Sequence, residues 1–369
     1  MLSDALRKAA EMLGSGLLHM SLGSPEFGDS RYRPVEFDRA NFHPLPETGP
    51  RRALGFVDGG NREILHAPDF SVQLVRVSTV IFRDGQRALG RRMPPLAEFL
   101  CLARAVPLDG RIVYRAGLIP VGRTAGTLLP DEEWLVVDSR DEQLAPGRFR
   151  LDISVVGAAA RRFAEWLALS ELVSEELEPG DIAVRDGTLQ TAVRHEELAA
   201  TRAFAAAQER GVVLAALAKT SQLLTTSGVS LLAAVEELSR QSPSGGGRWF
   251  YHPLVMNDHP EHRAEIFACR LHPQARHVFR LEILREQARR MSTSDVGELV
   301  AAIAANSGDL SFPGYPFGLV DADEQARVRH GESEALRAVF ASALAEKGLW
   351  KAVQGHVSAT DAHDILDEI

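Results

Sequence analysis

Hydrophobic and polar positions change their spacing several times along the chain, and these changes predict the order of its elements. Residues 1–20 repeat apolar side chains at helical spacing among charged ones, which predicts an amphipathic helix rather than a signal peptide. Residues 21–50 are rich in Pro, Gly and Arg without periodicity and predict an extended arm. From Arg52, the runs ALGFVDGG, REILHAP and SVQLVRVSTVIFR, punctuated by Gly, Asn and Pro, predict a three-stranded meander.

The remainder of the chain alternates helix-like and strand-like segments. Residues 91–150 carry short strand candidates, RIVYRAGLI and EWLVVDS, between Pro and Gly turns and are expected to form an inserted subdomain. Beyond them the pattern predicts helices over about 153–177, 194–210, 294–306 and 321–346 and in SLLAAVEELSR, and strands over 181–184 and in GVVLAALAKTS, RWFYHPLV, AEIFACRLH and HVFRLEIL. This order predicts an α/β fold with a mixed sheet flanked by helices. The body is then residues 51–346, between a helix and arm (1–50) and a C-terminal tail (347–369).

Composition and charge exclude several classes of protein. A formal net charge of −9 argues against broad electrostatic coating of nucleic acid, so any DNA contact must be local. The longest apolar stretches, such as 212–218, are far shorter than the roughly 20 residues of a membrane-spanning helix, so a soluble, cytoplasmic protein is expected. Cys101 and Cys269 are the only cysteines, too few for a disulfide framework, and are expected as core or surface thiols.

Two Asp-Gly pairs stand at the ends of apolar runs, and their aspartates are the clearest candidates for catalytic or metal-binding residues. Asp58 stands in GFVDGG and Asp186 in IAVRDGTL, where a carboxylate can reach a cleft while its backbone stays in the sheet. Glu165, on the predicted helix before the second pair, could join them, and three such carboxylates could hold one or two divalent metal ions. Asp-Gly alone also favours a plain β-turn, and a helical glutamate is commonly solvated; Glu171 and Glu175 are rivals for the role of Glu165.

Three further residues are candidates for phosphodiester chemistry. Lys219 closes the run VVLAALAKTS, where a cation could hold a phosphate, although a snorkelling lysine has the same pattern. It lacks the Walker A spacing, so ATP hydrolysis is not expected. Tyr315 precedes a turn, and Asp323 is expected in the first turn of a helix, where the helix dipole favours a carboxylate and could be its only role.

Taken in order, VDGG, a helix with RRFAEW, VRDGTL, VVLAALAKTS and a terminal GYPFGLVDAD resemble the successive motifs of the NurA nuclease family, over about residues 54–328. The resemblance implies an RNase H-like fold, a homodimer and a Mn²⁺- or Mg²⁺-dependent DNA nuclease. Members of the family degrade DNA 5′–3′, cut single strands and act with a HerA-type hexameric ATPase in DNA end resection and double-strand break repair.

By position, the resemblance makes Asp58, Glu165 and Asp186 metal ligands and places Tyr315 in the family's Tyr-Pro motif. Asp323 stands where some members have histidine, which leaves open whether it is a fourth ligand or a proton carrier. The main alternative function is an inactive DNA-binding adaptor subunit that docks on the motor without cutting. A phosphohydrolase acting on nucleotides or small phosphoesters is the second alternative.

Overall fold

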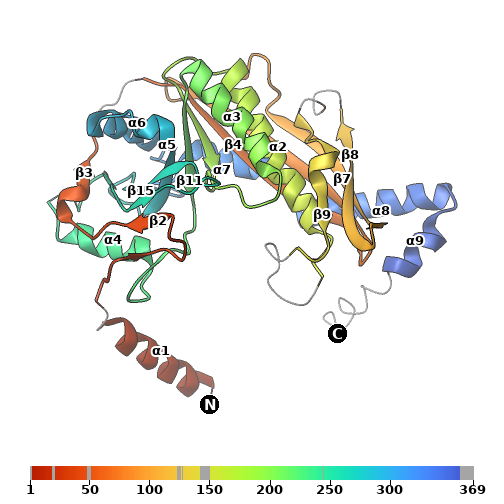
Figure 1. The fold of residues 1–369 in the computed structure, drawn as a ribbon, viewed down its shortest axis with the longest axis horizontal. Helices are drawn as coiled ribbons and strands as arrows, with labels where there is room; N and C mark the ends of the chain where they lie inside the picture. The colour runs from red at the N-terminus through yellow and green to blue at the C-terminus, as the bar shows by residue number, and fades with distance from the viewer. Residues whose placement is uncertain are drawn as a thin grey trace. The chain divides into compact units, whose positions relative to one another are not determined.

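The computed structural model describes residues 2–18, 21–47, 51–122, 126, 128–141, 150–243 and 245–357. The chain divides into two compact units. Unit 1 comprises Met1–Pro50, Gly187–Leu189 and Ala216–Tyr315, and unit 2 comprises Arg51–Asp186, Gln190–Ala215 and Pro316–Ile369. Figure 1 labels many of the elements of both units, and each unit is described by itself below.

Unit 2 is built on a mixed sheet. Its strands are β4 (Leu54–Ala67), β5 (Phe70–Arg83), β6 (Gln86–Ala88), β7 (Leu96–Leu108), β8 (Arg111–Val121), β9 (Val136–Asp138) and β10 (Ile182–Asp186). They lie in the order β10-β4-β5-β7-β8-β9, with β6 on β5. β10 runs parallel to β4, whereas the other pairs are antiparallel. The predicted α/β fold with a mixed sheet is confirmed.

One face of this sheet is covered by α2 (Val155–Glu175). A Cβ on Gly55 would lie 2.8 Å from Leu172 Cδ2, and one on Gly59 would lie 2.6 Å from Glu165 Oε1. Because these glycines have no side chains, the helix packs directly on the backbone of β4. Behind it lies α3 (Glu196–Arg210), joined to α2 by an edge-to-face contact between Trp166 and Phe204 at 5.4 Å.

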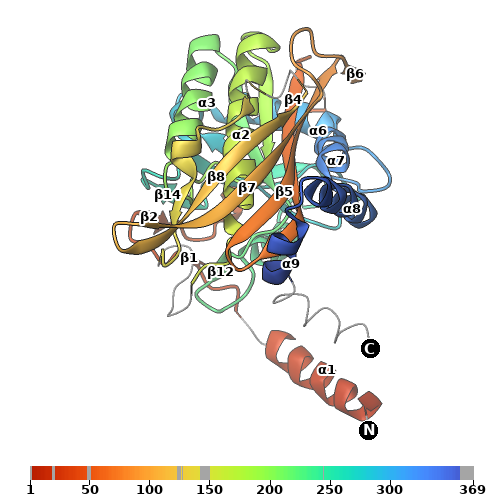
Figure 2. The same ribbon diagram turned by 90° about the vertical axis from the view of Figure 1, so that its right-hand side faces the viewer.

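The opposite face of β4 is covered by α7 (Phe317–Ala326). A Cβ on Gly318 would lie 2.1 Å from the Phe56 ring, and one on Gly60 would lie 2.3 Å from the carbonyl oxygen of Ala326. Strand residues alternate between faces, so Phe56 and Gly60 share the face of Asp58. Further along, α8 (His330–Glu346) and α9 (Trp350–Val357) cover β4 and β5. Figure 2 shows α2 and α3 on one side of these strands and α7 and α8 on the other.

Unit 1 contains an antiparallel sheet in the order β3-β13-β15-β16. These strands are β3 (Phe42–Pro44), β13 (Trp249–Tyr251), β15 (Ala264–Arg270) and β16 (Phe279–Leu284). α4 (Leu231–Arg240) packs on the face that carries Trp249 and Tyr251, and α6 (Thr293–Ala305) reaches Phe250 on the other. Figure 1 shows α4 and α6 on opposite sides of β15. Two short antiparallel pairs, β1 (Pro25–Glu26) with β12 (Leu224–Thr225) and β2 (Tyr32–Pro34) with β14 (Val255–Asn257), lie in the same unit.

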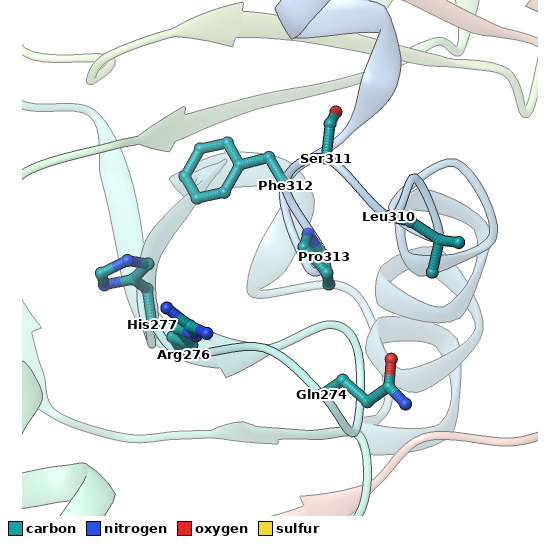
Figure 3. A pocket seen from close by; sticks show the side chains of 7 residues that line it. All are labelled: Gln274, Arg276, His277, Leu310, Ser311, Phe312 and Pro313. Atoms are coloured by element: carbon teal, nitrogen blue, oxygen red, sulfur yellow. The ribbon is translucent and has the colours of Figure 1, made fainter.

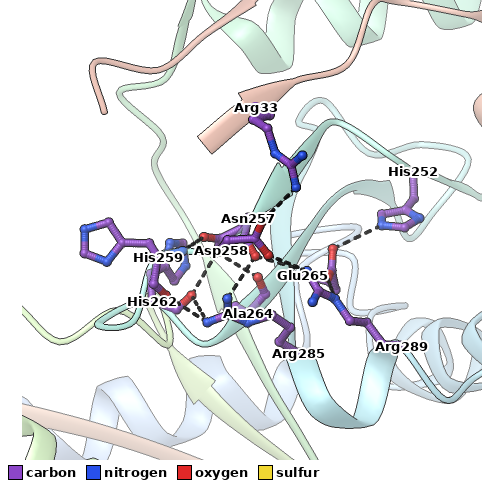
Figure 4. Close-up of polar contacts among 10 residues, drawn as sticks. All are labelled: Arg33, His252, Asn257, Asp258, His259, His262, Ala264, Glu265, Arg285 and Arg289. Atoms are coloured by element: carbon purple, nitrogen blue, oxygen red, sulfur yellow. Dashed lines mark hydrogen bonds and ion pairs between the residues drawn. The ribbon is translucent and has the colours of Figure 1, made fainter. Parts of the chain in front are cut away.

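A polar network fixes the turn between β14 and β15 (Figure 4). The Asn257 amide donates to the carbonyl oxygens of His262 and Ala264, both at 2.8 Å. Arg285, at the start of α5 (Arg285–Ala288), donates to the carbonyl oxygens of Asn257 at 3.0 Å and of His259 at 2.8 Å. Since each contact joins a side chain to a backbone carbonyl group in or beside the turn, the network is structural.

The structure departs from the sequence-based expectation at three places. The first two runs after Arg52 form the single strand β4, with a register shift between Glu63 and Leu65. β7, from the expected inserted subdomain, continues the main sheet by pairing with β5, from Phe70 opposite Arg104 to Ser78 opposite Leu96. The helix expected over 321–346 is two helices, α7 and α8, because the backbone is extended at Arg327 and Arg329.

The remaining expectations concern the ends, the cysteines and the membrane. Residues 2–18 form α1 (Leu2–Leu18), as predicted, and the tail contains α9, while residues 358–369 lie outside the described part. Cys101 and Cys269 are free and buried, and burial raises the pKa of Cys101 to about 12. None of the helices in the described ranges has the length and apolar character needed to cross a bilayer.

Candidate metal centre

Two aspartates lie on neighbouring parallel strands of unit 2. Asp58 belongs to β4 and is 7% exposed, and Asp186 is the last residue of β10. Because Arg185 pairs with Val57, the residues that follow, Asp186 and Asp58, are neighbours on adjacent strands. The N–H of Gly59 donates to Asp58 Oδ1 at 2.7 Å and holds this carboxylate against its own backbone. Both aspartates are therefore strand residues and not residues of isolated turns.

A third aspartate comes from α7. Asp323 lies in the last turn of that helix, so its expected place in a first turn is wrong and the helix dipole does not favour its charge there. Arg327, four residues on, donates to Asp323 Oδ2. The pKa of the Arg327 guanidinium is raised by this hydrogen bond and by the charges of Asp323, Glu324 and, most weakly, Asp58. A cation thus lies beside Asp323.

Asp58, Asp186 and Asp323 form a cluster in which one carboxylate oxygen from each lies within 4.8 Å of the other two. Carboxylate oxygens are the ligands that hard divalent cations select. Opposite ligands of an ion bound at ~2.1 Å lie ~4.2 Å apart, so the observed spacing fits one such ion with little movement. Three negative charges held this close also repel one another, and a cation relieves that repulsion.

Glu165, the predicted third ligand, is not part of this cluster. It is 2% exposed and lies on the α2 face of β4, whereas Asp58 points toward α7. Its Oε2 accepts a hydrogen bond from Arg185 Nη2 at 2.6 Å, and its Oε1 accepts one from Arg161. Both oxygens are therefore engaged by guanidinium groups, and a role as metal ligand stays a prediction.

The geometry of α2 separates Glu165 from its rivals. Glu165 contacts Gly59, next to Asp58, while Leu172, beside Glu171, contacts Gly55 at the start of β4. Glu171 is thus more than one helical turn farther from Asp58. Glu175, one turn beyond, accepts a hydrogen bond from Arg92 Nη1 at 2.5 Å. Of the three glutamates, Glu165 lies at the Asp58 end of the helix.

Behind Glu165, a buried charge network fixes the end of β10. The Arg185 guanidinium lies over the Trp166 ring, 4.4 Å from its centroid, and the Trp166 Nε1 donates to Glu196 Oε1 at 2.8 Å. Burial would raise the pKa of Glu196, but the charge of Arg162 and the N–H of Ala192 hold it below its usual range. Because Arg185 directly precedes Asp186, this network holds Asp186 in place.

Lys219 and Tyr315 belong to unit 1 and contact each other. The Lys219 Nζ lies 5.5 Å from the centroid of the fully buried Tyr315 ring, a cation–π contact. Lys219 itself is exposed and directly follows β11 (Val213–Ala218), as the sequence indicated. Their catalytic roles stay predictions.

Sequence reasoning missed the residues that assemble the cluster. Gly60 and Gly318 let α7 pack against β4, and a signal was present, because glycine inside a strand marks a close approach of another backbone. Arg161 could also have been predicted as an ion-pair partner of Glu165, because it stands four residues earlier on the same helix. Arg185 was predictable from alternation, because it faces away from the side of the sheet that carries Asp186.

Comparison with known proteins gives the family. The model of the NurA domain matches residues 109–328, which include Asp186 and Asp323 but not Asp58. No curated protein sequence matches the chain. The crystal structure of the NurA nuclease from Sulfolobus solfataricus is similar over 84% of this chain and 89% of its own, with a TM-score of 0.51 and 15% identity.

Two further solved structures are more distant. A structure described only as NurA covers 80% of this chain and 89% of its own, with a TM-score of 0.42 and 9% identity. Endonuclease V from Ciona intestinalis, solved with a DNA 24-mer, covers 75% and 85%, with a TM-score of 0.34 and 12% identity. The match of the family model spans more than half of the sequence, and the chain belongs to the NurA family.

Proposed function

We propose that this protein is a divalent-metal-dependent deoxyribonuclease that hydrolyses phosphodiester bonds. The observation that carries the proposal is the convergence of Asp58, Asp186 and Asp323, whose oxygens lie within 4.8 Å of one another. Membership of the NurA family and the fold shared with the NurA nuclease from Sulfolobus solfataricus support it.

In this proposal the three aspartates bind the metal, and a bound divalent ion supplies Lewis-acid stabilisation of charge on the scissile phosphate. Asp58 and Asp186 are fixed by the sheet and Asp323 by the packing of α7 on β4, so the ligand set is formed before substrate binds. Mn²⁺ should support activity at least as well as Mg²⁺, because a set of carboxylates without a rigid octahedral cage tolerates both ions.

The other candidate residues have supporting roles. Glu165 holds Arg185 and thereby positions Asp186, which explains a buried carboxylate bound to two arginines. Lys219 binds a phosphate of the substrate, and the Tyr315 ring, against which its ammonium group lies, restricts where it can reach. These assignments replace Glu165 by Asp323 as the third ligand.

The finer activity rests on the family resemblance. We propose 5′–3′ exonuclease and single-strand endonuclease activity, with a HerA-type hexameric ATPase, in DNA end resection and double-strand break repair. The strand order β7-β5-β4-β10, three antiparallel strands followed by a parallel one, supports an RNase H-like sheet. A homodimer or motor contact is supported by the apolar side chains of α1, because Leu2, Leu6 and Met12 are 77%, 62% and 68% exposed.

The test is cleavage of end-labelled single- and double-stranded DNA with Mn²⁺, Mg²⁺ or EDTA. Wild-type protein is compared with D58N and with D84N, a matched control. Asp84 stands in an Asp-Gly turn, with 71% of its side chain exposed, so the same change removes a carboxylate outside the one cluster found among the described residues. We expect metal-dependent cleavage by wild type and D84N, and a loss of at least 100-fold in D58N.

The outcomes separate the competing functions. Cleavage by D58N at the wild-type rate would show that the site is elsewhere. If wild type stimulates the motor ATPase fully but does not cleave DNA in its presence, the protein is instead an inactive adaptor subunit. Turnover of nucleotides or small phosphoesters but not of DNA would indicate a phosphohydrolase acting at the same cluster.

A further inference from the structure

Unit 1 contains a pocket that the chemistry proposed at the aspartate cluster does not use. Its volume is about 470 Å³, within the range of ~300–1,000 Å³ that small-ligand sites occupy. Gln274, Arg276 and His277 line it from one loop, and residues 310–313 line it from another (Figure 3). In chain order the second loop directly precedes α7, which carries Asp323.

The two loops are held together by Gly314. This residue has a φ of +92°, and a Cβ built on it would lie 2.6 Å from the Cβ of Ala275 in the other loop. Its N–H donates to the carbonyl oxygen of Ser307 at 2.8 Å. The pocket is therefore formed by backbone packing that only glycine permits, and not by two loops that merely lie near each other.

An aromatic ring forms one wall of the pocket. Phe312 is half-buried and stacks on the buried Tyr315 ring, with centroids 5.2 Å apart and planes at 26°. The His277 ring meets the Phe312 ring edge-to-face at 6.0 Å. The Phe279 ring also lies nearly perpendicular to Phe312, at 6.1 Å. Since Phe312 stacks on Tyr315 and contacts these two further rings, it is held as a rigid platform on which a planar ligand can stack.

The charge of the pocket is positive in a chain with a net charge of −9. Arg276 is exposed, and among the described residues no carboxylate forms an ion pair with it. No residue that lines the pocket is acidic, and the nearby Asp309 accepts hydrogen bonds from the N–H and hydroxyl of Ser311. The Gln274 amide adds a donor and an acceptor, as Figure 3 shows.

A planar platform, a guanidinium group and a neutral amide match three features of a nucleotide, which are the face of its base, its phosphate and the polar edge of its base. We propose that this pocket binds one nucleotide of a single-stranded DNA substrate, with the base on Phe312, the phosphate on Arg276 and the base edge at Gln274. The choice of a DNA strand over a free nucleotide rests on the proposed function. Such a pocket also explains how an acidic protein binds DNA locally, since stacking needs no broad basic surface.

The test uses fluorescence anisotropy with a labelled thymidine 15-mer and the full-length protein, with Ca²⁺ in place of Mn²⁺ so that binding is read without cleavage. The variants are R276Q and F312L, and the matched control is R290Q, an exposed arginine of unit 1 outside the pocket. F312L keeps apolar packing on Tyr315 and removes the ring. We expect about ten-fold weaker binding for F312L. R276Q should bind about five-fold more weakly, with a salt slope reduced by about 1, and R290Q should bind as wild type.

A second readout reports stacking directly. An oligonucleotide with a single 2-aminopurine should lose fluorescence on binding to wild type, and F312L should restore it, which a merely structural effect would not do. Binding of R276Q and F312L within two-fold of R290Q would overturn the proposal. Free dAMP that binds as tightly as the oligonucleotide would overturn the assignment to a strand. Because no arm requires cleavage, failure of the pocket and failure of the nuclease proposal are distinguishable.

Discussion

Replacing Gly60 with Ala should separate Asp323 from the other two aspartates. The added Cβ would lie 2.3 Å from the carbonyl oxygen of Ala326, where an ordinary contact is at least 3.4 Å. The obstacle is helix backbone, which cannot rotate away, so α7 must move by about 1 Å. Asp323 is three residues before Ala326 in that helix and moves with it.

The expected magnitude follows from this displacement. A shift of ~1 Å in a catalytic group can lower the rate about 100-fold. Overpacking of this kind costs about 1–3 kcal/mol of unfolding free energy, which leaves a domain of ordinary stability folded. Because Asp323 is a proposed ligand, the Mn²⁺ concentration that gives half-maximal activity should also rise.

The assay is kcat on a single-stranded oligonucleotide across a Mn²⁺ titration, with circular dichroism and urea unfolding on the same samples. G117A is the control, because its Cβ would meet only the carbonyl oxygen of Leu102, at 4.0 Å. G117A should behave as wild type. If folded G60A cleaves within two-fold of wild type at every Mn²⁺ concentration, then Asp323 does not depend on the packing of α7, and the reasoning is refuted.

Two further predictions concern buried charges. E165Q leaves the buried Arg185 without its carboxylate and should lower the unfolding free energy by about 3–5 kcal/mol. Because Glu165 positions Asp186 without binding the ion, Mn²⁺ affinity should fall less than in D186N. Urea unfolding and Mn²⁺ titration measure both, and an affinity loss as large as in D186N would make Glu165 a ligand. In unit 1, burial would raise the pKa of Glu282, but Arg280 and His262 lower it from 4.5 to about 2. Because the folded pKa is the lower one, the carboxylate stabilises the protein above pH 4.5, by about 3 kcal/mol, and this is lost as the pH falls toward 2. The difference in unfolding free energy between wild type and E282Q should therefore shrink between pH 4.5 and 2, and a constant difference would contradict this account.

The two aspartates of the cluster that lie on strands could be predicted from the sequence. Asp58 and Asp186 end apolar runs, and a period of two places each residue on a known face of its strand. The sheet and most helices followed from the same patterns. The positions of Asp58 and Asp186 could be predicted because each aspartate stands at the end of the apolar run that predicts its strand.

Asp323 could not be placed in this way. The predicted helix over 321–346 has no Gly or Pro at Arg327–Arg329, and Gly331, the nearest glycine, lies inside α8, so one helix was expected where two exist. Asp323 therefore lies at the end of a helix and not, as was expected, at the start of one. Its position depends on the contact of Gly60 with Ala326, which joins residues far apart in the sequence.

Glu165 shows a different limit of prediction from the sequence. Its place on α2 was predicted correctly, but whether its carboxylate binds a metal or an arginine depends on which residues share its face. Alternation puts Arg185, not Asp186, on that face, and helical spacing adds Arg161. Two cations outside the aspartate cluster thus engage a carboxylate that the motif alone assigned to the metal.

The central claim is that Asp58, Asp186 and Asp323 bind a divalent ion together. Electron paramagnetic resonance of Mn²⁺, titrated into wild type, D58N, D186N, D323N and the control D84N, tests it without any need for substrate. The account predicts a bound signal in wild type and D84N and an affinity at least ten-fold lower in each of the other three. Mn²⁺ affinity in D323N equal to that of wild type would contradict it.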